Sequence, residues 1–129
     1  MEMNEMLGRE VDVSEYGNLE TFPVTAPTRI TFHTEELQAL CPAVEGIQPD
    51  IYDTKISYTA MTKAIESKSL KLWLVTYRNQ RIFGEHLAVA LFDKINAVEG
   101  ITDVRINMIQ NIRGGIITHI AYPLNARDK

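Results

Sequence analysis

The sequence is poor in the residues that build disulfides, metal sites and membrane spans. It has one cysteine, too few for an internal disulfide, and three scattered histidines without the close spacing of zinc ligands. We therefore expect no bound metal. The apolar runs are shorter than a bilayer requires and no signal-peptide pattern is visible, so we expect a cytoplasmic protein without membrane contact.

Basic residues are also too few for a general nucleic-acid-binding surface. The formal net charge is −4, whereas such surfaces usually show a basic surplus. The charge is uneven, because residues 1–20 hold six acidic residues against one arginine, and residues 55–81 hold six basic residues against one glutamate. A locally cationic region on an acidic protein suits an anionic small molecule, and we expect no direct nucleic-acid partner.

The size and composition of the chain are those of one globular domain, with 129 residues of which 45% are hydrophobic. Residues 1–27 are acidic and are broken by glycine and proline, which predicts an arm with little regular structure. The domain is then expected to span residues 28–129.

Alternation of polar and apolar residues predicts four strands, at residues 28–33, 51–58, 102–109 and 115–121. In the second strand one face is formed by Tyr52, Thr54, Ile56 and Tyr58. A short helical turn is expected at residues 35–40.

Helical spacing predicts one helix from about Glu66 and a second at residues 83–97, whose inner face comprises Phe83, Leu87, Leu91 and Ile95. The order of elements predicts an α+β fold, in which a four-stranded antiparallel sheet carries two helices, inserted between strands 2 and 3, on one face. The other face and the sheet edges then need cover, which favours a homo-oligomer.

Cys41 and Asp50 are candidates for catalysis. Cys41 opens a loop punctuated by proline and glycine, where side chains are presented rather than packed, and Asp50 follows nine positions later. A thiolate nucleophile needs a nearby group that manages protons on its target. A small buried cysteine and a turn aspartate explain the same spacing, so both interpretations stay open.

Several cations are candidates for binding phosphate. Lys68 and Lys71 are three positions apart on a predicted helix, so both can lean to one side. Arg113 precedes Gly114, where the backbone can approach a ligand closely, and arginine suits forked recognition of phosphate oxygens. A solvated helix face and a glycine turn are the alternative explanations.

Glu66 and Glu85 are candidate ligands for a nitrogen-rich base. Carboxylates accept hydrogen bonds from the N–H groups along one edge of a guanine-like ring. Glu85 follows an apolar segment, where burial without a partner is costly. Both residues also stand near the predicted start of a helix, where a carboxylate is favourable, and that explanation stays open.

The order of these residues resembles one protein family. Residues 66–73, Glu-Ser-Lys-Ser-Leu-Lys-Leu-Trp, look like the signature of the QueF-type nitrile reductases, the NADPH-dependent 7-cyano-7-deazaguanine reductases. Residues 77–79 are similar to the segment that follows this signature. Residues 41–50 are similar to the nucleophile loop of the family, and residues 113–116 to its last motif.

The resemblance implies a fold and an activity. The fold is the tunnelling fold, whose strand–strand–helix–helix–strand–strand units assemble into oligomeric barrels with active sites between subunits. The activity is reduction of the nitrile of 7-cyano-7-deazaguanine to the amine 7-aminomethyl-7-deazaguanine, with NADPH as cofactor, for queuosine in transfer RNA.

The resemblance also implies a role for each candidate residue. Cys41 would add to the nitrile carbon to form a thioimide, and Asp50 would supply a proton to the nitrile nitrogen. The pyrimidine edge would be held by Glu85 together with Glu66 and Ser67 of a neighbouring subunit. The phosphates of NADPH would be received by Lys68, Lys71, Arg113 and Gly114.

Two departures from the family pattern leave other functions open. The loop between Cys41 and Asp50 is two residues longer, around Val44-Glu45-Gly46, and Gly84 stands where the family usually has a histidine that helps to close the site. One alternative is the related QueF-like amidinotransferase, which adds ammonia to a 7-cyano-7-deazaguanine base in nucleic acid but lacks the signature lysines. Another is a non-catalytic purine- or pterin-binding tunnelling-fold module.

Overall fold

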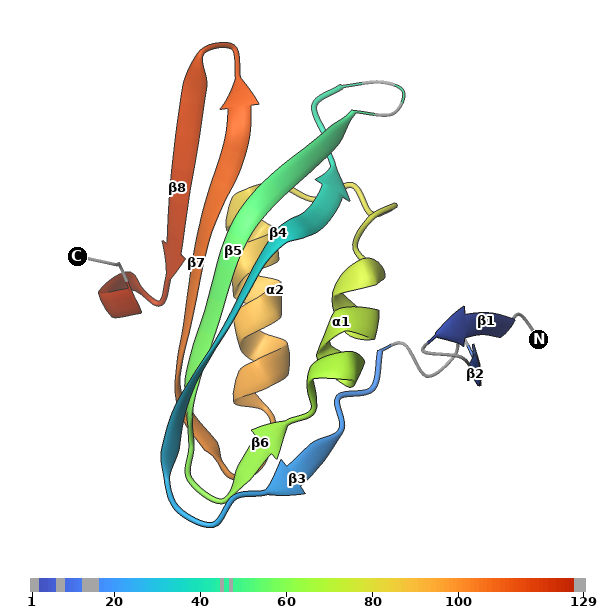
Figure 1. Ribbon diagram of the computed structural model, residues 1–129. Helices are drawn as coiled ribbons and strands as arrows, with labels where there is room; N and C mark the ends of the chain where they lie inside the picture. Colours follow the sequence, from blue (N-terminus) through green and yellow to red (C-terminus); the bar gives the residue numbers. More distant parts are fainter. Residues whose placement is uncertain (1–2, 7–8, 13–16, 45, 47, 127–129) are drawn as a thin grey trace.

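The computed structural model describes residues 3–6, 9–12, 17–44, 46 and 48–126. Its main sheet is antiparallel, with the strand order β4-β5-β7-β8. These strands are β4 (Thr28–Leu40), β5 (Pro49–Ala60), β7 (Ile101–Arg113) and β8 (Ile116–Tyr122). Both helices, α1 (Ser67–Val75) and α2 (Gly84–Asn96), lie on the same face of the sheet (Figure 1). The predicted α+β arrangement of two helices on an antiparallel sheet is confirmed.

Strand β5 forms the floor of the hydrophobic core. Its alternate residues Tyr52, Thr54, Ile56 and Tyr58 are buried, as their spacing predicts. Since successive side chains of a strand point to opposite faces, this alternation turns one continuous side of β5 toward the helices. The same alternation places Asp50, two residues before Tyr52, on the buried face.

Helix α2 covers the core with Leu87, Leu91 and Ile95, which are fully buried. Burying one such side chain contributes on the order of 1.5–3 kcal/mol to stability. Phe83, which was expected on the same inner face, is 47% exposed. The prediction was wrong there because Phe83 is the N-cap, with extended backbone, and so does not follow the helical period.

The expected helical turn at residues 35–40 is wrong, because β4 continues to Leu40. The register of β4 against β5 shifts between Thr34 and Leu37, so Glu35 and Glu36 form a bulge. A bulge interrupts the alternation of apolar residues, and the interrupted pattern resembles helical spacing. Beyond the bulge, Leu37 pairs with Tyr52 and Ala39 with Asp50.

Residues 1–27 contain more regular structure than expected. Strand β1 (Met3–Met6) pairs with β2 (Arg9–Asp12), while residues 1–2, 7–8 and 13–16 lie outside the described part of the chain. Strand β3 (Thr21–Pro23) pairs with β6 (Lys63–Ile65), the strand that leads into α1. Because β3 and β6 are only three residues long, alternation was too short to predict either of them.

In the described residues, neither helix combines the length and apolar character that a bilayer crossing requires.

Candidate active site

The ends of β4 and β5 bring Cys41 and Asp50 to one edge of the molecule. Asp50 pairs across the ladder with Ala39, two residues before Cys41, and the Cys41 N–H donates to the Gln48 carbonyl oxygen at 3.1 Å. This bond closes the intervening loop at its base. Asp50 is buried and Cys41 is half-buried. The fold therefore supplies a thiol and a carboxyl group at the same loop base.

The Arg81 side chain binds backbone carbonyl groups of the loop between Cys41 and Asp50. Its guanidinium donates to the carbonyl oxygens of Cys41 at 3.2 Å, Val44 at 3.0 Å and Gly46 at 2.6 Å. Glu45, the middle residue of the expected insert, lies outside the described residues. The sequence indicated no role for Arg81, since it was only one basic residue in the short segment between the two predicted helices.

Asp50 and Arg113 form an ion pair across 63 residues of sequence. The Arg113 Nε lies 3.2 Å from Asp50 Oδ1, and the same guanidinium donates to the Pro49 carbonyl oxygen. The Asp50 side chain is only 5% exposed, and a buried carboxylate without a compensating partner is costly. Arg113, predicted as a phosphate ligand, is in this structure the partner of the candidate acid.

Tyr52 brings a phenol hydroxyl to this edge of the molecule. From the sequence, Tyr52 was expected only as a residue on one face of a strand. Its ring is fully buried, and its hydroxyl has no hydrogen-bond partner among the described residues. Burial raises the pKa of the Tyr52 hydroxyl far above its usual value, and the neighbouring Asp50, Glu85 and Cys41 raise it further. The phenol is therefore neutral and able to donate. In the sequence, the one indication that Tyr52 lies at the site was its position two residues after Asp50 on the same strand.

Glu85 lies in the first turn of α2 and is exposed. The preceding residue, Gly84, is buried, and a Cβ there would lie 3.0 Å from the Tyr52 hydroxyl oxygen and 2.7 Å from Ile120 Cδ1. Glycine therefore lets the start of α2 pack closely against Tyr52. We call the group Cys41, Asp50, Tyr52, Glu85 and Arg113 the cysteine end.

Glu66 caps α1. Its two carboxylate oxygens accept from the N–H groups of Lys68 and Ser69, each at 2.8 Å. Glu66 therefore acts as a helix cap, which was one of the two explanations that the sequence left open. Each of its oxygens can still accept a second hydrogen bond, for example from a ligand. Ser67, the first residue of α1, is exposed. We call the group Glu66, Ser67 and Lys68 the signature end.

The two ends are far apart within one chain. Helix α1 begins beside β6, at the end of the sheet opposite to the end of β4 that leads into Cys41 (Figure 1). One chain by itself does not bring Glu66 and Ser67 to Cys41. The structure thus brings together Cys41, Asp50 and Arg113, near Glu85, and leaves the signature end elsewhere.

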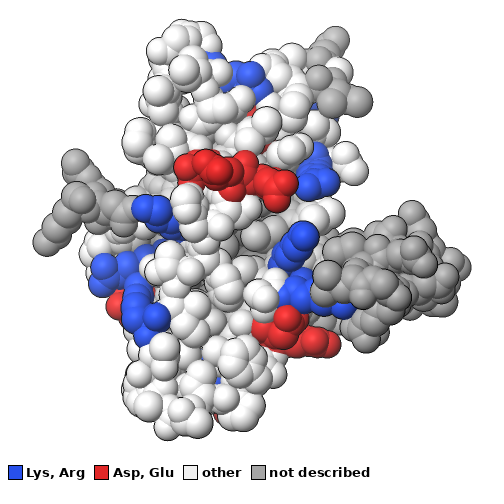
Figure 2. Space-filling model, viewed as in Figure 1, with Lys and Arg blue, Asp and Glu red and all other residues white. Residues whose placement is uncertain are grey.

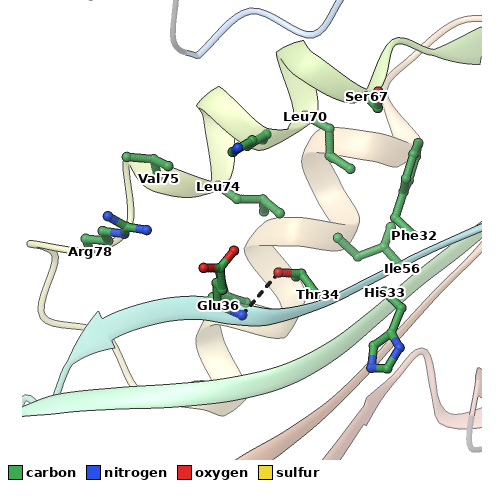
Figure 3. A pocket seen from close by; sticks show the side chains of 12 residues that line it. Phe32, His33, Thr34, Glu36, Ile56, Ser67, Leu70, Leu74, Val75 and Arg78 are labelled. Atoms are coloured by element: carbon green, nitrogen blue, oxygen red, sulfur yellow. Dashed lines mark hydrogen bonds between the residues drawn. The ribbon is translucent and has the colours of Figure 1, made fainter. Parts of the chain in front are cut away.

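A groove of about 260 Å³ lies between α1 and the strands beneath it. Lys71 and Arg78 contribute cations to its lining, and Ser67 contributes a hydroxyl. Figure 3 shows apolar side chains between these groups, with Glu36 on β4 facing Arg78 across the groove, while His33 points toward the other side of the sheet. A cationic rim over an apolar floor fits part of a phosphate-bearing dinucleotide. Arg78 was not among the predicted site residues, and Lys68 does not line the groove.

Gly114 and Gly115 form the tight turn between β7 and β8. Their φ angles are +57° and +80°, and a Cβ at either position would meet nothing within 4 Å. The turn therefore requires glycine for its backbone conformation rather than for space. This accounts for Gly114 as a turn residue, the alternative that the sequence left open. Among the described residues, no group of three or more histidine, cysteine, aspartate or glutamate side chains is placed to hold a metal ion.

Known proteins similar to this chain share one family. The profile of the family described as QueF-like protein matches residues 49–129. The NADPH-dependent 7-cyano-7-deazaguanine reductase of Syntrophus aciditrophicus (strain SB) is 39% identical over 114 residues, which cover 86% of this chain and 79% of the relative. The protein of the same name from Frankia casuarinae is 37% identical over 100 residues, covering 77% of this chain and 78% of the relative.

A solved structure, the apo form of the archaeosine synthase QueF-Like, superposes with a TM-score of 0.62 over 76% of this chain and 92% of that chain. The two sequences are 18% identical, so this likeness shows a shared fold. The match to the family profile and the similarity to the two reductases show that the chain belongs to the QueF-like protein family.

Proposed function

We propose that this chain reduces the nitrile of 7-cyano-7-deazaguanine to the primary amine with NADPH, the activity that its relatives' names state. The observation that carries the proposal is the meeting of Cys41 and Asp50 at one loop base, through the pairing of Ala39 with Asp50. A nucleophile and a proton donor in one place are the groups that addition to a nitrile requires.

The proposed chemistry begins at Cys41. Its thiolate sulfur bonds to the nitrile carbon while the nitrogen gains a proton, supplied from Asp50, which gives a covalent thioimide. Bound NADPH is a source of hydride. Transfer of one hydride to the thioimide carbon lets the carbon–sulfur bond break, so the thiolate leaves and an imine remains. A second hydride and a second proton convert the imine to the amine, so the reaction consumes two NADPH and two protons.

The separation of the two ends favours a site shared by two copies of the chain. Glu85 at the cysteine end would hold the pyrimidine edge together with Glu66 and Ser67 from the signature end of a second subunit. The hairpin of β7 and β8 exposes Ile112, Ile116 and Ile117, and a surface of that kind is usually covered by a partner. We infer a homo-oligomer in which tunnelling-fold units form barrels by pairing their sheet edges.

The cofactor would be held by the cations near α1. Lys71 and Arg78 line the groove, and Lys68 lies on the first turn of the same helix. Arg113 joins them in this proposal only when it leaves Asp50, because its guanidinium is engaged in the ligand-free chain. A reduced thiol and a reduced cofactor fit the cytoplasm, where thiols are kept reduced.

The surface supports a free base as substrate rather than a nucleic acid. On the face in Figure 2, lysine and arginine side chains form separate groups on either side of an acidic band. A polymer-binding groove usually presents a continuous basic surface. The described residues on this face therefore favour a small ligand.

The test is to incubate the protein with 7-cyano-7-deazaguanine, first alone and then with NADPH. We expect a mass increase of one substrate on Cys41 without NADPH, and oxidation of two NADPH for each amine formed when the cofactor is present. A Cys41→Ala variant is the control and should show neither result. A mass increase without NADPH oxidation, followed by uptake of ammonia, would assign the chain to the amidinotransferase chemistry instead. No mass increase, no oxidation and no substrate-induced rise in Tm would identify a non-catalytic module.

A further inference from the structure

Two buried tyrosines on β5 differ in how their hydroxyls are satisfied. Tyr52 and Tyr58 lie on the same face, and both are fully buried. The Tyr58 hydroxyl accepts a hydrogen bond from the Ile65 N–H at 2.8 Å. The Tyr52 hydroxyl has no partner among the described residues. Because a buried hydroxyl without a hydrogen bond is destabilising, a polar group without a partner among the described residues calls for an explanation.

The position of the Tyr52 hydroxyl points to a ligand rather than to the core. Tyr52 stands two residues after Asp50 on the buried face, and its hydroxyl lies against Gly84, the residue before Glu85. Asp50, Glu85 and Cys41 are all close enough to act on its ionisation. The hydroxyl therefore lies against the start of α2 and in the electrostatic field of the residues that the proposed reaction uses.

The Tyr52 hydroxyl is a donor that the described residues of the cysteine end leave unused. Asp50 has one proton to give in the proposed reaction, and a carboxylate that has given its proton only accepts hydrogen bonds. The Arg113 guanidinium already donates to Asp50 and to the Pro49 carbonyl oxygen. A neutral phenol donates a hydrogen bond through its O–H group without giving up the proton. A nitrile or imine nitrogen is an acceptor, and a donor on that nitrogen makes the attached carbon more electrophilic toward hydride.

We propose that the Tyr52 hydroxyl donates a hydrogen bond to the nitrogen of the substrate that reacts at Cys41, and that it retains the imine for the second reduction. The inference rests on the proposed function. The phenol keeps its proton throughout, so the residue orients and polarises the nitrogen without transferring a group. Gly84 belongs to the same arrangement, since a Cβ at this position would lie only 3.0 Å from the hydroxyl oxygen.

The first test needs no activity. Tyr52→Phe removes only the hydroxyl, and Tyr58→Phe is the matched control on the same strand. We expect the ligand-free Tyr52→Phe protein to have a Tm equal to or above that of the wild type, because it loses no hydrogen bond. Tyr58→Phe should have a lower Tm, since the Ile65 N–H loses its partner. A lower Tm for Tyr52→Phe would mean that the hydroxyl has a structural partner, and would overturn the inference.

The second test follows the products. Tyr52→Phe should still form the thioimide, because Cys41 and Asp50 remain, while amine formation falls by about 100-fold, the usual loss on removing one donor at a reacting centre. Part of the imine should escape and react with water to give the aldehyde and ammonia, with one NADPH oxidised per aldehyde. Tyr58→Phe, at a temperature where it is folded, should keep the wild-type ratio of amine to aldehyde.

The outcomes separate this inference from the function on which it rests. A wild-type rate of amine formation without aldehyde in Tyr52→Phe would overturn the role of Tyr52 and leave the nitrile reductase intact. A wild-type protein that forms neither thioimide nor amine would remove the proposed function, and the role of Tyr52 with it.

Discussion

The cysteine end and the signature end differ in how far hydrogen bonds within the fold satisfy their polar groups. At the signature end, both carboxylate oxygens of Glu66 accept hydrogen bonds from the backbone of α1. At the cysteine end, the Tyr52 hydroxyl is buried without a partner among the described residues. The signature end thus contributes to the folding of α1 as well as to the proposed recognition, whereas the cysteine end includes a hydroxyl whose proposed partner is the substrate. Substitutions at the two ends should therefore affect stability and activity in different proportions.

The largest expected effect on activity is at Cys41. A Cys41→Ser variant should form no detectable thioimide or amine, because the hydroxyl is a far weaker nucleophile than a thiolate. Its Tm should stay within a few degrees of the wild type, because the change is small and Cys41 is only half-buried. Intact mass, amine assays and thermal unfolding measure the three quantities. Retained amine formation would exclude Cys41 as the nucleophile.

Arg81 should come next, through the loop that carries Cys41. Arg81→Ala removes three hydrogen bonds to the loop carbonyls and should lower kcat/KM by roughly 10- to 100-fold, as displaced reacting groups do. Arg78→Ala is a useful comparison, because Arg78 lines the groove near α1 instead. It should raise the KM for NADPH and leave thioimide formation unchanged. If Arg81→Ala forms thioimide at the wild-type rate, the loop does not depend on this arginine.

Glu66 should affect stability more than Cys41 or the Tyr52 hydroxyl does. Glu66→Ala removes the cap of α1 and should destabilise the chain by about 1 kcal/mol, in the range usual for lost N-caps. Glu66→Asp is the matched control, since aspartate is also a good N-cap residue but its shorter carboxylate would reach a ligand less well. Chemical denaturation measures the stability, and substrate titration measures the affinity. Equal stability of all three proteins would show that the cap contributes little.

The smallest expected effect is at high pH. The pKa of Tyr52 is raised in the folded chain, so the folded state holds this proton more tightly than the unfolded state. The stabilising contribution is complete below about pH 10, the usual value for tyrosine, and is lost as the pH rises above it. The free energy of unfolding of the wild type should therefore fall more steeply above about pH 10 than that of Tyr52→Phe. Parallel curves from denaturant titrations would contradict this assignment.

The sequence predicted the parts of the fold that depend on local patterns. Alternation in β5 correctly placed Tyr52 and Tyr58 on one buried face, and helical spacing located α1 and α2. Prediction failed where a local pattern was interrupted or very short. The bulge at Glu35 and Glu36 hid the continuation of β4, and the three-residue strand β3 has too few residues to show a period.

The sequence proposed candidate residues for the site but not their geometry. Cys41, Asp50 and Arg113 were singled out by residue type and motif, yet the ion pair between Asp50 and Arg113 had no signal in either segment. Tyr52 and Arg81 were missed. A buried tyrosine on a strand and an arginine between two helices are common in any fold. Their importance comes from neighbours distant in sequence.

By itself, the amino-acid sequence determined the types and order of most elements, because hydrophobic periodicity and capping act within a few residues. It also determined the residues that match the family signature. Only the tertiary structure decided which polar groups are satisfied. It gave the Tyr58 hydroxyl the Ile65 N–H as partner, and it placed the Tyr52 hydroxyl beside Gly84 without a partner among the described residues. The reason is physical, since hydrogen bonds between distant segments exist only once strand pairing and helix packing have brought their donors and acceptors within about 3 Å.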